Sequence, residues 1–263
     1  MGKSAMIKVQ VVNKEGTIIA EAAGTREVNL PVSRTYEEGD RVVFLVDETP
    51  AFYVFQADDA LGEALVYVTG EVSYEIPFGE KKVCYSPKIF SGESHLITAR
   101  KAREWEYESY RNLAVNVMDQ HGDTNCYPHA TANVETRGES VFAARNAIDG
   151  VTSNHSHGYW PYGSWGINRN PQATMRVDFG REVTTDRIEI YTRADFPHDA
   201  WWTKATVRFS DDTTMVCDLV KTDEGQEFTF PPKKVRWVQL EELIKADDPS
   251  PFPALSQLKV YGK

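Results

Sequence analysis

The 263-residue chain has few cysteines, since it contains only Cys84, Cys126 and Cys217, which lie far apart in the sequence. Such an odd and scattered set forms no disulfide framework, so we expect three buried free thiols. The chain also lacks an apolar run of about 18 residues, which excludes a membrane-spanning helix. Its first residues have no apolar core of signal-peptide length, so we expect a cytoplasmic protein or the trimmed form of an extracellular one.

Positive charge is also in short supply, with 29 Lys and Arg against 39 Asp and Glu and a net charge of −10. No basic tail offsets this balance, which argues against a nucleic-acid partner. Walker A, GxSxG and strand-linked GxGxxG motifs are missing, so common nucleotide and acyl-transfer sites are not indicated. Asp58-Asp59 is the one carboxylate pair in a polar loop of the first half. Because a glycosidase needs two carboxylates at a set separation, we expect Asp58 only to cap a turn or helix.

Short runs rich in Val, Ile, Tyr, Phe and Thr follow one another through the first half, separated by Gly- and Asp-containing turn signals. This pattern predicts an antiparallel β-sandwich domain of unknown role over residues 1–105. Residues 82–86 belong to the expected strands. The segment 99–112 lacks Gly and Pro and is crowded with charge, so it is predicted to be a helix or linker at the domain boundary.

Residues 106–263 again read as strands, including 173–179 and 187–193. Tight turns are expected at 180–186 and 231–234. If successive strands reverse direction, the segments before 173 and after 193 lie at one pole, together with 221–226 and 245–254. Long loops at one end of a sandwich are the usual place for binding, so we expect the site there.

Two loop-like segments, 146–166 and 193–202, hold four of the six Trp and three of the six His residues of the chain. Indole rings gain most when they are buried, so their concentration beside polar side chains suits a surface that holds a sugar ring. The predicted ligand-binding residues are His157, Trp160, Arg193, Asp195, His198 and Trp201.

Not all four indoles can bind a ligand. Trp201 and Trp202 are adjacent and point to opposite faces of a strand, so we expect Trp202 to be buried and Trp201 to face outward. Trp165 is expected in the core, which leaves Trp160 as the exposed stacking platform. The alternative for the polar residues is a solvated loop without ligand, stabilised by an internal Arg193–Asp195 or His198–Asp199 pair. His155 and His157 could also hold zinc, although no other ligand pattern supports it.

Six segments in order carry a family resemblance: RNLAVNV at 111–117, YPHATANVE at 127–135, NAIDG at 146–150, SWG at 164–166, MRVDFG at 175–180 and PALSQLKVYG at 253–262. With these, residues 111–262 resemble the discoidin, or coagulation factor V/VIII type C, family of galactose-binding-like domains. That family includes the family 32 carbohydrate-binding modules. Residues 1–105 resemble no family that we recognise. The resemblance implies an all-β fold of two β-sandwich domains, with residues 106–263 a discoidin-like jelly roll.

The resemblance also implies a structural calcium ion. Carried over to this sequence, its ligands are Asp149, carbonyl groups near Asn146 and Thr152, the Ala254 carbonyl, and the side chain at Gln257. Calcium prefers six to eight oxygen ligands, and carboxylates tighten the site. The family has Glu where this chain has Gln257, which lowers the expected affinity. The alternative is that Asp149 only makes a turn.

Together these patterns predict a non-catalytic protein whose second domain binds a neutral glycan through aromatic and polar loops at one pole. Single shallow sites bind weakly, roughly from micromolar to millimolar Kd. Substitution of Trp160 by Ala is expected to abolish that binding. Two alternatives remain open: a glycan-active enzyme with an interdomain site, and a protein–protein interaction module in which the aromatic loops grip a partner or the first domain.

Overall fold

Antiparallel strands form nearly all of the regular structure, as the β-branched and aromatic runs of the sequence predict. The computed structural model describes residues 6–122, 124–153, 158–194 and 200–263. The first half contains β1 (Ile7–Val12), β2 (Ile18–Gly24), β3 (Glu27–Val32), β4 (Arg41–Val46), β5 (Ala51–Gln56), β6 (Ala64–Val68), β7 (Val72–Glu75), η1 (Gly79–Lys82), β8 (His95–Lys101) and α1 (Glu104–Tyr107). The second half contains β9 (Arg111–Asn112), β10 (Cys126–Tyr127), β11 (His129–Ala132), η2 (Thr136–Gly138), η3 (Ser140–Phe142), η4 (Ala144–Ile148), β12 (Trp165–Gly166), β13 (Met175–Thr192), β14 (Trp202–Phe209), β15 (Thr214–Asp218), β16 (Gln226–Lys245) and β17 (Ala254–Gly262).

The first half is a sandwich of two antiparallel sheets. One sheet has the strand order β2-β1-β4-β7, and the other has the order β10-β6-β5-β8-β3. Alternate residues of β3 and β7 are buried, as expected for strands with one face on a core. Phe44 of β4 stacks on Phe55 of β5 with ring centroids 4.3 Å apart, so side chains of the two sheets meet in the core.

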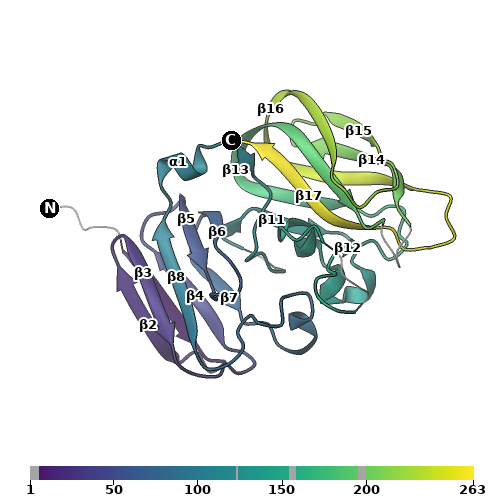
Figure 1. Cartoon of the computed structure of the whole chain (residues 1–263). Coiled ribbons are helices and arrows are strands. Elements are labelled where there is room, and N and C mark those ends of the chain that lie inside the picture. Colours follow the sequence, from purple (N-terminus) through teal and green to yellow (C-terminus); the bar gives the residue numbers. More distant parts are fainter. Residues whose placement is uncertain (1–5, 123, 154–157, 195–199) are drawn as a thin grey trace.

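The second half is built around one large antiparallel sheet with the order β12-β17-β13-β16-β14-β15. The short strands β11 and β9 pair with β13 and β17. Figure 1 shows this half as green and yellow ribbons beside the purple and blue first half. Its core holds Trp165 and Trp202, whose rings lie 6.3 Å apart. Both halves confirm the predicted all-β class.

The two longest strands, β13 and β16, bend together. Their ladder pairs Asp178 with Trp237 and then Val183 with Val235, so β13 carries extra residues in a bulge between these pairs. Gly180 stands in the bulge with a φ of 68°, and its N–H donates to the Asp178 carboxylate at 2.7 Å. The bulge lets the sheet curve without ending either strand.

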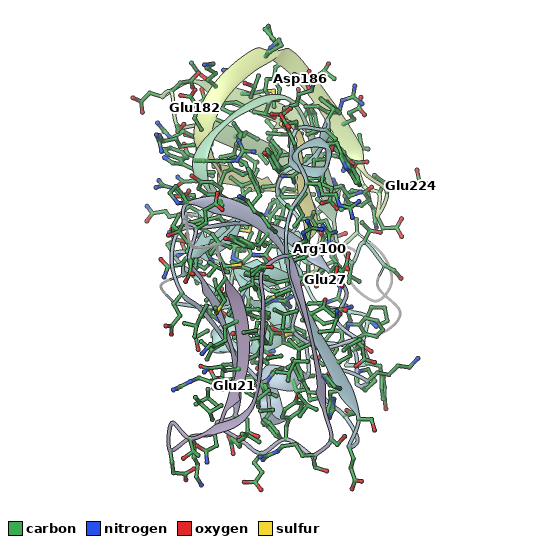
Figure 2. The ribbon with its side chains drawn as sticks, turned by 90° about the vertical axis from the view of Figure 1, so that its left-hand side faces the viewer. Glu21, Glu27, Arg100, Glu182, Asp186 and Glu224 are labelled. Carbon is green, nitrogen blue, oxygen red and sulfur yellow. The ribbon has the colours of Figure 1, made fainter. Side chains whose placement is uncertain are left out.

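The turns predicted at 180–186 and 231–234 are therefore wrong as breaks between strands. Residues 183–185 of β13 pair with residues 233–235 of β16, so both strands continue through the bend. Figure 2 shows Glu182 and Asp186 at the outer end of this half. The segments before and after β13 still meet, since Ile167 and Arg193 line one cavity.

The two sandwiches share an apolar contact. Strand β10 of the second half pairs with β6 and so extends a sheet of the first sandwich. Several buried side chains from beyond residue 105 join the first core, namely Met118, Cys126, Val141, Phe142 and Tyr162. The segment between the sandwiches thus packs against both.

The segment 99–112 is predicted to be a helix or a linker. Its helical part is only the single turn α1, because β8 continues to Lys101 between its partners β3 and β5. The strand predicted at 82–86 is wrong, since η1 and the turn after it occupy these residues.

All three cysteines are free and buried, as predicted. Within the described ranges, no helix has the length and apolar character needed to cross a membrane.

Candidate functional site

Loops distant in sequence meet at one pole of the second half. The Arg193 N–H donates to the Ala254 carbonyl at 2.9 Å, which ties the end of β13 to the start of β17. The Thr192 hydroxyl donates to the Thr222 carbonyl at 3.0 Å, which adds the segment between β15 and β16. The end of β13 and the segments 221–226 and 245–254 therefore lie together, as strand parity predicts.

A cavity of about 260 Å³ lies at this pole. Its apolar lining includes the buried side chains of Phe142, Ile167 and Ala254. Phe252, half-buried between two prolines, adds an aromatic ring. A concave apolar surface of this kind can hold the face of a small ring-shaped ligand.

Three arginines give the same cavity a rim rich in hydrogen-bond donors, although the chain is acidic overall. Arg193 is only 2% exposed, and its guanidinium lies 5.7 Å from the ring centroid of Tyr162. Arg169 is exposed and lies 4.9 Å from the ring of Phe252. Arg137 is held by Glu139 at 2.5 and 2.8 Å. Planar guanidinium groups set beside rings offer fixed donors to ligand oxygens.

The backbone before β13 shapes one wall of the cavity. Asn168 and Arg169 have φ values of 49° and 59°, in the left-handed region. The Asn168 N–H donates to the Thr136 hydroxyl at 2.9 Å and so fixes this turn to η2. At Gly166 a Cβ would lie 2.6 Å from that same hydroxyl, so the close approach requires glycine here.

Trp160 lies elsewhere. It is 39% exposed and lines a second cavity of about 440 Å³, which the two halves share. Leu61, Tyr85 and Pro87 of the first half line that cavity with it. Among the described residues, the predicted platform and Arg193 therefore line different cavities.

The predicted burial of two other indoles is confirmed. Trp165 and Trp202 are buried, with exposures of 0% and 1%, and the Trp165 N–H donates to the Val134 carbonyl at 3.0 Å. Trp201 is half-buried, and the Lys221 ammonium lies 5.3 Å from its ring. The Ala246 N–H donates to the Trp201 carbonyl at 2.9 Å, which places Trp201 at the pole with Arg193.

His157, Asp195 and His198 lie outside the described residues, as does His155. Their predicted roles stay predictions. Asp195 and His198 follow Arg193 closely in the chain, whereas His157 precedes Trp160.

Three of the five residues predicted to bind calcium come together. The Gln257 amide nitrogen donates to the Asn146 carbonyl at 2.6 Å and to Asp149 Oδ1 at 2.7 Å. The Ala254 carbonyl accepts the Arg193 N–H at the pole, and Thr152 is half-buried. The predicted ligand oxygens of Asn146 and Asp149 are thus engaged by an N–H donor of a third predicted ligand. This donor set fits a calcium ion poorly, since calcium takes oxygen ligands only.

The carboxyl group of Asp149 is also unusual. Burial raises its pKa to about 6, against the opposing effects of the Arg145 charge and of hydrogen bonds from the Val151 N–H and the Gln257 amide. Asp149 also makes the predicted turn, because its Oδ1 accepts the Val151 N–H at 2.8 Å.

In the first half, Asp58 caps a turn as predicted, since its carboxylate accepts the Ala60 N–H at 3.0 Å. Its other oxygen lies 3.1 Å from Nδ1 of the buried His95. Two cavities between the halves have one described carboxylate each in their linings, Glu75 in one and Asp149 in the other.

Sequence reasoning missed four side chains that line the cavity at the pole: Arg137, Phe142, Arg169 and Phe252. A signal for Phe252 was present, because a phenylalanine between two prolines stands in the 245–254 segment that was placed at the pole. Nothing local marks Phe142, which reaches the cavity only through the packing of η3.

Comparison with known proteins finds a family match for part of the second half. Residues 129–248 match the family model of the F5/8 type C domain. No curated protein matches the chain significantly.

Several solved structures are similar in part. Chitosan-binding module 1 of a chitosanase/glucanase from Paenibacillus sp. IK-5 is 20% identical, with a TM-score of 0.39 over 58% of this chain and 99% of that one. The lectin domain of lectinolysin, solved with Lewis B antigen, is 17% identical, with a TM-score of 0.43 over 58% and 97%. A fucose-binding module of Streptococcus pneumoniae is 15% identical, with a TM-score of 0.40 over 58% and 98%.

Proposed function

Since residues 129–248 match the F5/8 type C, or discoidin, domain, we propose that the protein binds a neutral glycan without catalysis. The binding site is the cavity that Arg169, Arg193 and Phe252 line at the pole. The observation that carries the proposal is a nearly buried guanidinium, that of Arg193, beside an apolar floor at the meeting point of the loops.

The chemistry of the cavity suits a sugar. The ring of Phe252 and the buried apolar side chains can cover the C–H face of a pyranose, and guanidinium N–H groups can donate to its hydroxyls. At about 260 Å³ the cavity is near the lower end of ligand pockets, roughly 300 Å³, which suits one terminal unit of a glycan. Asp195 and His198, which follow Arg193 closely in the sequence, and Trp201 are further proposed contacts. We expect a Kd roughly between micromolar and millimolar.

The test compares binding by three variants on a glycan array and by titration with the best array ligand. Phe252→Ala and Arg169→Met should each weaken binding at least about tenfold, which corresponds to about 1.4 kcal/mol. Arg236→Met is the matched control, because Arg236 is exposed beside the bend of β16 and does not line the cavity. It should bind like the parent protein.

Trp160→Ala decides between the two cavities. If the cavity at the pole is the site, this variant keeps the affinity of the parent for the glycan. Loss of binding in Trp160→Ala with full binding in Phe252→Ala would move the site to the cavity between the halves, with His157 and Trp160 as its ligand residues. No binding by the parent to any glycan would overturn the function itself.

The alternatives gain less support. An interaction role in which Trp160 seals against the first half would require a buried indole, and Trp160 is 39% exposed. A glycan-active enzyme requires two carboxylates across one cavity, and the described lining of no cavity between the halves contains more than one. Release of reducing sugar from the bound glycan would favour the enzyme.

A further inference from the structure

The amide of Gln257 occupies the centre of the group of residues predicted to bind calcium. Its nitrogen donates to the Asn146 carbonyl at 2.6 Å and to Asp149 Oδ1 at 2.7 Å. Its oxygen accepts the Gly150 N–H at 3.0 Å. That last bond fixes the orientation of the amide, since only the nitrogen end can then face the carboxylate. Gln257 is 1% exposed, so every polar atom of its side chain has a partner inside the protein.

A positive charge lies beside this amide. Arg145 is 6% exposed, and its Nη1 lies 3.0 Å from Asn146 Oδ1 and 4.0 Å from Asp149 Oδ2. The guanidinium thus supplies the charge that a buried carboxylate requires, and the Gln257 amide supplies the direct hydrogen bond.

Arg145 is held in place by further contacts. Its Nε donates to the Asp119 carbonyl at 2.9 Å, and its Nη2 donates to the Val117 carbonyl at 3.3 Å. Its guanidinium also lies 4.4 Å from the ring of Tyr85, a residue of the first half. The charge therefore cannot leave without loss of contacts in both halves.

We infer that this chain has replaced the calcium ion of its family with two groups of its own: the neutral Gln257 amide, which donates hydrogen bonds, and the Arg145 guanidinium, which supplies the positive charge. A calcium ion would need oxygens where these N–H donors stand, and it would lie close to a buried positive charge. The loops that the ion would hold together, at η4 and at β17, are instead joined by Gln257. The domain folds and stays folded without calcium.

The first measurement uses the unaltered protein in calcium-free buffer, with and without calcium chloride and with EDTA. The melting temperature should be the same within about 1 °C in all conditions, because no ligand binds the native state at this position. Isothermal titration with calcium should detect no site that Asp149→Asn removes. A single calcium site that this substitution abolishes would overturn the inference.

The second measurement uses a variant with a carboxylate at position 257, where the family has Glu. Gln257→Glu replaces the N–H donors by a second carboxylate next to Asp149, so two buried like charges face each other. In EDTA the melting temperature should fall by roughly 5–10 °C, and calcium should restore part of the loss. Gln172→Glu adds the same charge at an exposed position before β13 and should leave the melting temperature unchanged in both buffers.

Two results of these melting experiments would contradict the inference. A Gln257→Glu protein as stable in EDTA as the parent would overturn the inference, because the amide nitrogen would then contribute nothing. If Gln257→Glu does not fold at all, the same melting experiment is done with Gln257→Met. It lacks both donors and should lower the melting temperature equally with and without calcium, whereas rescue by calcium would contradict the proposal.

Discussion

His129 and Asp119 form a buried pair at the edge of the second sandwich. His129 Nδ1 lies 2.6 Å from one Asp119 oxygen, and the Ala130 N–H donates to the other at 2.9 Å. Burial works against the charged imidazole, but the hydrogen bond and the charge of Asp119 raise the pKa of His129 above its ordinary value. The charged pair thus stabilises the entry to β11.

This pair makes the stability depend on pH. A raised folded-state pKa stabilises the protein fully below the unfolded value of about 6.5, and the contribution is lost as pH rises through the folded value. We expect the free energy of unfolding of the parent to fall, relative to that of Asp119→Asn, as the pH rises above about 6.5. Urea unfolding of both proteins across this range measures the difference. A constant difference would contradict the role of the pair.

At the scale of elements, the paired bends of β13 and β16 decide which loops meet at the pole. The bulge at Gly180 rests against Tyr127 of β10, so the curvature of the second sheet is fitted to the strand that joins the first. Without the bend, β13 would carry Arg193 away from the turn at Asn168 and Arg169. The shape of the cavity thus depends on a glycine in the bulge of β13, away from Arg193 along the chain.

Gly180→Ala should therefore destabilise the protein strongly. Its φ of 68° is strained for any L side chain, and a Cβ would lie 2.5 Å from the ring of Tyr127. We expect a loss of about 2–4 kcal/mol in the free energy of unfolding, part from strain and part from overpacking. Gly16→Ala is the control, because Gly16 has a φ of 83° and nothing within 4 Å of an added Cβ.

The control should lose only the backbone part, about 1 kcal/mol. Equal losses in Gly180→Ala and Gly16→Ala, measured by chemical denaturation, would show that the contact with Tyr127 does not constrain the bend.

At the scale of the whole molecule, the two sandwiches depend on each other. Strand β10 completes a sheet of the first half, and Met118 and Tyr162 pack into the first core from beyond residue 105. Figure 1 shows the teal segment lying between the purple and the yellow parts of the chain. Arg145 adds a contact with Tyr85 across the same boundary.

We expect the full chain to unfold in one cooperative transition. Differential scanning calorimetry should give one peak whose calorimetric and van't Hoff enthalpies agree. Met118→Ala should lower that peak as a whole, with a loss of about 2–5 kcal/mol, because the buried Met118 belongs to the first core although it lies in the second half of the sequence. Two separate peaks, only one of which moves in Met118→Ala, would show that the halves unfold independently.

Several features could be predicted from the sequence because their signals are local. Alternating β-branched and aromatic residues give strands, and ordered short motifs such as NAIDG and MRVDFG identify the family of the second half. The burial of Trp202 beside the more exposed Trp201 agrees with the period of two in a strand. The presence of Arg193 and Ala254 at one pole agrees with the strand-parity prediction, although the breaks counted at 180–186 and 231–234 are bends within strands.

The turns at 180–186 and 231–234 could not be told from bends, because Gly, Asp and Pro favour both. Whether such a segment ends a strand depends on the strand beside it, and here each bend keeps the other in the ladder.

By itself, the sequence determined that this protein is all-β and that residues 129–248 match a discoidin-type domain, since strand period and motif order are properties of neighbouring residues. Only the tertiary structure decided that Trp160 and Arg193 line different cavities and that Gln257 turns its nitrogen toward Asp149. These outcomes depend on contacts between segments far apart in the chain. Packing and the pairing of buried donors with acceptors set such contacts, and no local pattern records them.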